Sequence, residues 1–346
     1  MNKKTLNENK RMIKTFFKEF AQGAAVIFIF VLVIAYFSFK TMDDVSLDDV
    51  EIKRNNKGTS EQKQIKGKFL MAQTMYEDIY NIPEFYLNDD KAVEYLNEST
   101  NYNNMLKIFN TVPTYDEIKP FVESKKNIAT DYHSKLYIFR PFSKNAAKFA
   151  EYAIENKRFE DTKKAYQAIE SLIYFLSSGS VENNPYILEY MVSLGMKNVM
   201  IQSIKKIEDK LNNSQKKEIA NILIRLRDKS KDLKDALQGE KDLVMKALRL
   251  FRKNNPVKMS LIDLYSNPFK KSEDIYTEYY NKIKKAIPDG KHYKQIDTNK
   301  IEQIAKKYRE SRNPLIKNAV LHFKRLGEQV NDNLNDLDNL INRLEK

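Results

Sequence analysis

The sequence predicts an all-α protein, with a single N-terminal transmembrane helix followed by an extracytoplasmic helical-hairpin array or irregular bundle that ends in a long C-terminal helix. Residues 20–39 form one uncharged, apolar run. Beyond it, apolar residues recur at helical spacing, and no alternating run bounded by hairpin turns is present. Only eight glycines occur in 346 residues, while 42% of the residues are hydrophobic, which is enough to bury a core.

The run at residues 20–39 has the length of a membrane span. At about 1.5 Å per residue, 20 helical residues reach roughly 30 Å, the thickness of a hydrocarbon core. A cleaved signal peptide has a shorter apolar core followed by a small-residue cleavage site, which this run lacks. We therefore expect a membrane anchor formed by Phe20, Ala24, Val26, Ile27, Phe28, Ile29, Phe30, Val31, Leu32, Val33, Ile34, Tyr36 and Phe37.

The charges that flank this run predict its orientation. Six cations and two anions precede it, whereas five acidic residues follow between residues 43 and 51. Lys and Arg are retained on the cytoplasmic side. We expect a single-pass protein of the cytoplasmic (inner) membrane, with a cytoplasmic N-terminus and the bulk of the chain extracytoplasmic or periplasmic.

The amino-acid composition excludes some kinds of site and bears on which partners the chain can bind. The chain has no cysteine, which excludes disulfides, thiol catalysis and Cys-based metal sites. Of the net charge of +13, the residues before the span contribute +4, and the remaining +9 is spread along the chain. A basic chain can bind nucleic acid or anionic lipid, but an extracytoplasmic domain does not meet nucleic acid, so we expect no nucleic-acid partner. The alternative is reversed topology, in which a basic cytoplasmic domain binds nucleic acid or anionic lipid.

Four segments follow from these patterns. Residues 1–19 form a basic tail, 20–39 the span, 40–65 a polar linker and 66–346 an all-helical region. This last segment is either one domain or two, with the alternative boundary near residues 180–200.

Helical spacing, prolines and caps predict the elements of the first half. A helix begins near Lys66 and stops before Pro83, and short helices follow at about 89–97, 101–110 and 115–126. Their many aromatic residues are expected to fill the core, and an aromatic-lined groove is the alternative. Ser143 is expected to cap a helix that forms a hairpin with the next one. Phe159, Thr162 and Tyr166 fall where a tetratricopeptide hairpin places Tyr, Ala and an aromatic residue, so this hairpin resembles one such repeat. No second copy occurs at a 34-residue period.

In the second half, Pro185 opens a helix that Gly195 could bend, and Ser214 is expected to cap the next. Further helices are predicted at 231–254, 257–266 and 272–286. The last helix, at 315–345, has steps of four and three between its apolar residues. It is either packed on its own domain or a candidate interaction helix for self-association or a partner, with apolar positions at Ile316, Val320, Phe323, Val330, Leu334, Leu337, Ile341 and Leu344.

One short motif suggests chemistry. Residues 309–314, RESRNP, resemble the E-S-x-x-N-P entry of lytic transglycosylases, in which the glutamate is the general acid. That resemblance implies a peptidoglycan-cleaving enzyme with Glu310 as its acid. The family's following G-x-x-G-L-M-Q stretch is missing, and the spacing is one residue short. His133, His292 and His322 each stand alone, so we expect no metal and no cofactor.

The patterns together favour a membrane-anchored, non-enzymatic helical scaffold of the bacterial cell envelope, possessing no recognisable catalytic motif. Stacked helices present extended surfaces for protein contacts, as a secretion, motility or division assembly requires. The expected partners are the lipid bilayer and either other envelope proteins or a second copy. The alternative is a cell-wall-active enzyme or a binder of wall polymer.

Overall fold

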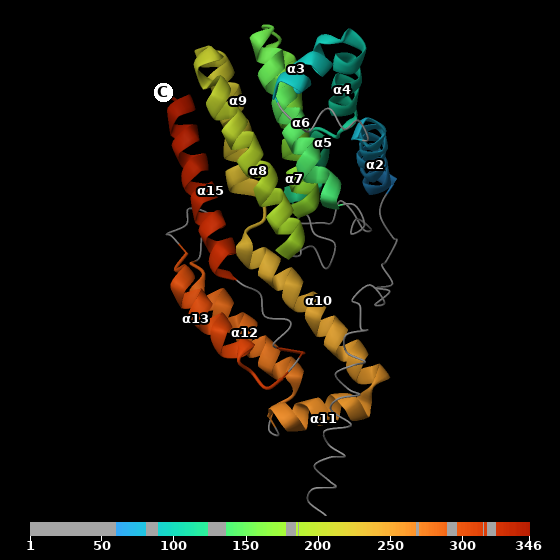
Figure 1. Ribbon diagram of the computed structural model, residues 1–346, viewed down its shortest axis with the longest axis vertical. Coiled ribbons are helices and arrows are strands. Elements are labelled where there is room, and N and C mark those ends of the chain that lie inside the picture. Colours follow the sequence, from blue (N-terminus) through green and yellow to red (C-terminus); the bar gives the residue numbers. More distant parts are fainter. Residues whose placement is uncertain are drawn as a thin grey trace, which may run out of the picture. The chain divides into compact units, whose positions relative to one another are not determined.

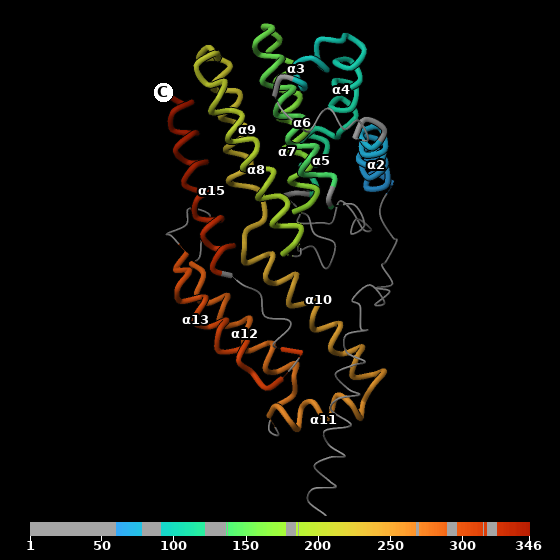
Figure 2. The backbone as a smooth tube through the Cα atoms, in the orientation of Figure 1, coloured from blue at the N-terminus to red at the C-terminus, as the bar shows by residue number. Residues whose placement is uncertain are grey.

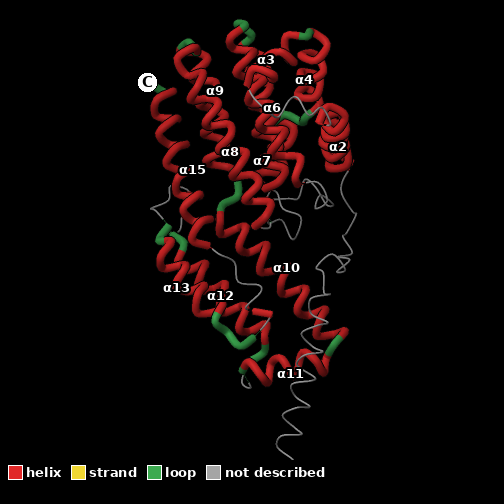
Figure 3. The backbone as a smooth tube through the Cα atoms, in the orientation of Figure 1, coloured by secondary structure: helices red, strands yellow, loops and turns green. Residues whose placement is uncertain are grey.

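The computed structural model describes residues 60–80, 89–123, 136–177, 185, 187–267, 270–288, 296–313, 315–316 and 323–346. Within these residues the backbone consists of helices and loops, without strands (Figure 3). The all-α prediction is therefore confirmed for this part of the chain. The helices are α2 (Ser60–Tyr80), α3 (Asp89–Asn97), α4 (Ser99–Thr111), α5 (Tyr115–Glu123), α6 (Leu136–Glu155), α7 (Phe159–Ser177), α8 (Ile187–Ile207), α9 (Asn213–Lys229), α10 (Leu233–Asn254), α11 (Pro256–Ser266), α12 (Ser272–Ala286), α13 (Thr298–Arg309) and α15 (Phe323–Leu344).

The described residues fall into two compact units. The larger contains residues 60–249 and 260–346. Of the smaller unit, the structure describes Leu250–Met259. Here the Lys258 ammonium lies 5.7 Å from the centre of the Phe251 ring, a cation–π contact.

Aromatic side chains hold the N-terminal helices of the larger unit against α6 and α7. The Phe69 ring on α2 lies 4.2 Å from that of Phe175, and the Tyr102 ring on α4 lies 4.6 Å from that of Phe149. All four rings are buried. Aromatic pairs at such distances add to the stabilisation from area burial alone. The expectation that these rings fill the core between short helices is confirmed for these pairs.

Helices α6 and α7 form the expected hairpin, and their turn is closed by the backbone. Lys157 adopts a positive φ of 61°, and the two amides at the turn donate back into α6, from Arg158 to Ala153 O at 2.8 Å and from Lys157 to Ile154 O at 3.0 Å. This is a Schellman motif, in which glycine usually occupies the position that Lys157 takes here.

Helices α8, α9 and α15 complete the larger unit around this hairpin. Helix α8 packs on α6 and α7, and α15 packs on α8, α9 and α13. Figures 1 and 2 show α15, close to the C-terminus, lying alongside α8 and α9, which end more than 90 residues before it begins. The C-terminal helix therefore packs on its own unit.

Several predicted boundaries are wrong, and each has a local cause. Ser143 lies inside α6 rather than capping it, because α6 begins at Leu136 and continues through Pro141 to bury Leu136 and Phe139. Ser214 is not a cap either, because Asn212 and Gln215 form a capping box. Helix α2 begins at Ser60, not near Lys66.

Helix α13 was not predicted. Asp297 caps it, accepting a hydrogen bond from the Lys300 amide at 3.0 Å. Its buried residues, Ile301, Ala305 and Tyr308, recur at steps of four and three, the spacing that identified the other helices.

The predicted membrane anchor at residues 20–39 lies outside the described residues, and so do the tail and the linker up to residue 59. His133, His292 and His322 lie outside them as well. None of the helices that the structure describes has the length and apolar character needed to cross a membrane.

Candidate functional site

A groove of about 870 Å³ is bounded by α6, α8 and α15. Helix α8 forms its floor, α6 one wall and α15 the other. We call it the α6–α8–α15 groove. Its lining residues are Arg140, Lys144, Ala147, Lys148, Glu151, Leu188, Met191, Val192, Leu194, Gly195, Asn198, Val199, Gln202, Ser203, Lys206, Gln329, Asp332 and Asp336.

The floor is apolar and partly exposed at its N-terminal end. Leu188 and Met191 are 59% and 43% exposed. Large apolar side chains at such exposure mark surfaces that another molecule can cover, especially where they share one concave face. The groove therefore offers apolar contact along one side of α8.

Gly195 lies in the middle of this floor. A Cβ atom built at Gly195 would meet nothing within 4 Å. The packing of this chain therefore does not require a glycine here, although a glycine inside a helix costs about 0.5–1 kcal/mol relative to alanine. What the glycine does provide is an open path to the helix backbone, which lets an occupant of the groove approach closely.

The α6 wall is basic. Arg140, Lys144 and Lys148 follow one another at steps of four, so their side chains share one face of α6. Neighbouring like charges on a helix repel each other by a few tenths of a kcal/mol per pair. An acidic group placed in the groove would relieve that repulsion. Further along this wall, the Lys206 ammonium lies 3.3 Å from the Glu151 carboxylate.

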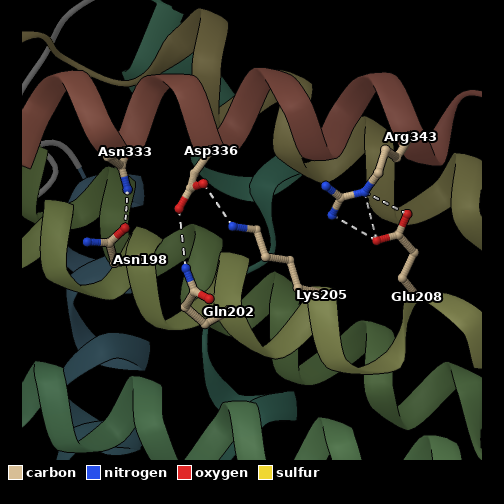
Figure 4. A network of polar contacts seen from close by, with 7 residues as sticks. All are labelled: Asn198, Gln202, Lys205, Glu208, Asn333, Asp336 and Arg343. Carbon is tan, nitrogen blue, oxygen red and sulfur yellow. Dashed lines mark hydrogen bonds and ion pairs between the residues drawn. The ribbon is translucent and has the colours of Figure 1, made fainter.

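The α15 wall carries carboxylates and is tied to α8 by the polar contacts of Figure 4. Asp336 accepts hydrogen bonds from Lys205 Nζ at 2.8 Å and from Gln202 Nε2 at 3.3 Å. Asn333 Nδ2 donates to Asn198 Oδ1 at 3.0 Å. These contacts fix the register of α15 along α8 and hold Asp332, which is exposed, at the rim.

Near the C-terminal end of α15, an ion pair joins this helix to the residues that follow α8. The Arg343 guanidinium donates to both Glu208 oxygens, at 2.9–3.1 Å (Figure 4). These hydrogen bonds raise the pKa of Arg343 further above its usual value. Two-point contact of this kind fixes geometry more than a single ion pair does.

Buried polar contacts support the floor from behind. Tyr166 Oη on α7 lies 2.9 Å from Ser203 Oγ on α8, and Ser203 Oγ also donates to the Ala147 carbonyl of α6 at 3.2 Å. Burial raises the pKa of Tyr166 far above its usual value, so its hydroxyl is neutral. Three helices therefore meet at one hydroxyl directly beneath the groove, which makes the floor rigid.

A second buried contact joins α7 to α9. Arg225 donates to both oxygens of Glu170, each at 2.8 Å, and the Glu170 side chain is fully buried. Burial raises the pKa of Glu170 to about 7, against the opposing effect of the Arg225 charge.

The apolar residues of the candidate interaction helix pack within their own unit, which is one of the two alternatives that the sequence leaves open. Four of its apolar residues face the interior of their own unit, namely Val330, Leu337, Ile341 and Leu344. Ile316 is also buried, and Leu334 is half-buried beside a small cavity of about 30 Å³. Val320 and the side chain of Phe323 lie outside the described residues. What α15 offers to the groove is its polar edge at Gln329, Asp332 and Asp336.

Glu310 is placed on an exposed turn. It is the C-cap of α13, and its amide donates to the Lys306 carbonyl at 3.1 Å. It is not among the residues that line the groove. Of the described residues in the RESRNP motif, Asn313 is the one that is fully buried. Asn313 Nδ2 donates to the hydroxyls of Ser266 and Ser272. Its Oδ1 accepts from the backbone amides of residues 315 and 316, so Asn313 links the residues after α13 to the end of α11 and the start of α12.

Sequence reasoning did not identify the groove, although signals for its parts were present. The steps of four between Arg140, Lys144 and Lys148 show a basic stripe, and Gly195 was noted only as a bend. Within the described residues no group of His, Cys, Asp and Glu is arranged to hold a metal ion.

Comparison with models of known families, with curated proteins and with solved structures gives no match. The groove is therefore interpreted from its own geometry.

Proposed function

We propose that this protein is a membrane-anchored, non-enzymatic scaffold of the bacterial cell envelope, and that its α6–α8–α15 groove binds an amphipathic helix of a partner envelope protein. The observation that carries the proposal is the groove itself, whose floor, apolar from Leu188 to Gly195, lies between a basic wall and an acidic wall. Recognition of a helix in a groove uses this arrangement of apolar anchors and flanking charges.

The dimensions favour a helix that inserts one row of side chains. The floor from Leu188 to Gln202 covers 14 helical steps, or about 21 Å. A volume of about 870 Å³ over that length leaves a cross-section of roughly 40 Å². A whole helix, 10–12 Å across, does not fit into that section, whereas a ridge of apolar side chains does. Gly195, at the centre, accommodates the largest of them.

The charges favour a partner with a defined orientation. Its acidic edge would face Arg140, Lys144 and Lys148, and its basic edge would face Asp332. Complementary charges of this kind contribute to specificity and to the association rate more than to affinity. The reversed helix would bring like charges together on both walls, so one orientation is preferred.

The membrane location rests on the sequence. The uncharged run at 20–39 and the cations before it favour an anchor with the helical unit outside the cytoplasmic membrane. A partner that reaches the groove is then an envelope protein, and nucleic acid is not expected. Such a protein would hold its partner at the membrane rather than act on it chemically.

A photo-crosslinking amino acid at Met191, in the full chain in its native cells, tests the proposal. Met71, which is 58% exposed on α2, is the control position. We expect Met191 to crosslink a defined envelope protein through a helix with an acidic edge. Gly195→Trp, which fills the groove, and Lys144→Glu, which reverses a wall charge, should each reduce that product at least fivefold.

The matched control for Gly195→Trp is Gly67→Trp. Gly67 is also a helical glycine, on α2, where a Cβ meets nothing within 4 Å. Gly67→Trp should leave the Met191 product unchanged. A Met191 product that persists in Gly195→Trp, one shared equally with Met71, or crosslinks only to wall polymer would refute the proposal.

A further inference from the structure

Helix α11 is apolar on the side where a helix at a protein surface is normally polar. Ile262 is buried and defines its inner side. On the opposite side, Leu264 and Tyr265 are 64% and 65% exposed, and Leu261 is exposed as well. A surface helix that has already buried one apolar stripe carries polar residues on the opposite face. We therefore expect the exposed apolar residues of α11 to contact another molecule or a membrane.

The exposed residues form a continuous stripe. Leu261, Leu264 and Tyr265 are related by steps of three and four, so they share a face about 100° wide at 100° per residue. Leu and Tyr side chains are typical of helices that lie in the interfacial layer of a bilayer, with the Tyr hydroxyl among the head groups.

Positive charge surrounds this stripe in the sequence. Residues 249–271 contain six cations and one carboxylate, Asp263. Asp263 is already engaged, because its Oδ1 accepts from the Ser272 amide at 2.9 Å and from the Ser272 hydroxyl at 2.6 Å. Lys271 is exposed, and Lys270, also exposed, contacts Glu278. An apolar stripe bracketed by cations is complementary to anionic lipid.

We infer that the outer face of α11 inserts into the head-group layer of an anionic bilayer. The inference rests on the proposed anchor, because a span at 20–39 would keep the helical unit at the membrane. The 20 residues from Lys40 to Thr59 reach about 70 Å at most when extended. A tether of that reach raises the local concentration of the α11 stripe at the surface, so a modest apolar area is sufficient for contact.

Charge also argues against a second copy as the occupant. Pairing two α11 faces would bring the cations of one copy toward those of the other, and Asp263 is engaged within its own chain. Like charges at such a contact oppose association. A bilayer containing phosphatidylglycerol supplies the negative charge that the second copy lacks.

Tryptophan fluorescence provides the test, because the chain contains no tryptophan. Three single-Trp variants of the full chain, Tyr265→Trp, Phe28→Trp and Met71→Trp, are reconstituted into vesicles of phosphatidylcholine and phosphatidylglycerol that contain brominated lipid. Phe28→Trp reports the anchor, and Met71→Trp reports an exposed site on α2. We expect Trp emission from Tyr265→Trp to be quenched at least twofold more strongly than from Met71→Trp.

The outcomes separate the inference from the anchor on which it rests. Quenching in Phe28→Trp, with Tyr265→Trp no better quenched than Met71→Trp, overturns the α11 inference and leaves the anchor in place. No quenching in Phe28→Trp overturns both. Leu264→Glu in the Tyr265→Trp background should abolish the quenching at that site, and so should vesicles of phosphatidylcholine alone. A blue shift in Tyr265→Trp that depends on protein concentration, without lipid quenching, would identify a second copy and contradict the inference.

Discussion

Two glycines inside helices should respond to alanine in opposite directions. At Gly327 on α15, an added Cβ would lie 2.8 Å from Thr298 Cγ2 on α13. At Gly195 on α8 it would meet nothing within 4 Å. The substitution is the same chemically, and both positions are helical. The difference between the two changes in the free energy of unfolding therefore isolates the effect of packing between α13 and α15.

The magnitudes follow from the two contributions. Replacing a helical glycine with alanine stabilises by about 0.5–1 kcal/mol. At Gly327 this gain is opposed by overpacking, which costs about 1–3 kcal/mol when an extra carbon enters a filled space. Gly195→Ala should therefore raise the free energy of unfolding by about 0.5–1 kcal/mol, and Gly327→Ala should lower it by about 1 kcal/mol.

Urea unfolding of the full chain in detergent micelles, followed by far-ultraviolet circular dichroism, measures both. With a slope of about 3 kcal/mol per molar urea, 1 kcal/mol moves the midpoint by about 0.3 M. Thr298→Ser removes the methyl group that the new Cβ would meet, so Gly327→Ala should become stabilising in that background. A destabilisation that persists there would refute the packing argument, as would a loss of stability in Gly195→Ala.

Three further predictions concern single contacts. The pKa of Glu170 is about 7 in the folded chain and 4.5 when unfolded, so between pH 4.5 and 7 the folded state binds a proton that the unfolded state has lost. The free energy of unfolding should therefore fall by up to about 3 kcal/mol as pH rises from 4.5 to 7. Glu170→Gln should flatten that slope in pH-dependent urea titrations, and an unchanged slope would contradict the assignment. Lys157→Gly should stabilise by about 1 kcal/mol, because glycine adopts the positive φ without strain; a lower thermal midpoint would count against this. Asn313→Ala should cost about 2–4 kcal/mol through its four lost hydrogen bonds, whereas Glu310→Gln should change stability by less than about 0.5 kcal/mol, and equal effects in unfolding measurements would be inconsistent with their burial.

Local patterns predicted many helices well. The short helices expected at 89–97, 101–110 and 115–126 correspond to α3, α4 and α5. Apolar spacing identifies such elements because it directly reflects the face that each buries. Errors arose where a local signal competed with burial. Ser143 was expected to start the helix, but α6 begins earlier, at Leu136, and thereby buries Leu136 and Phe139.

The groove could not be predicted in the same way. Its walls come from α6 and α15, and the contact between Gln202 and Asp336 joins residues 134 positions apart. The sequence shows a basic stripe on α6 and a polar edge on α15, yet nothing local indicates that they face each other across α8. The burial of Leu337 and Ile341 likewise depends on where α15 packs, and their spacing fits packing within the chain as well as packing on a partner.

Cysteine accessibility at the groove tests the central claim most directly, since the chain has no cysteine of its own. Full-length Met191→Cys and Met71→Cys are treated with a membrane-impermeant maleimide in spheroplasts and again after purification. We predict that Met71→Cys is labelled in both, because the proposed topology places the helical unit outside the cytoplasmic membrane. Met191→Cys should be protected in spheroplasts and become labelled only after the partner is removed. Equal labelling of both sites in spheroplasts would show an empty groove, and no labelling of Met71→Cys there would show that the unit faces the cytoplasm.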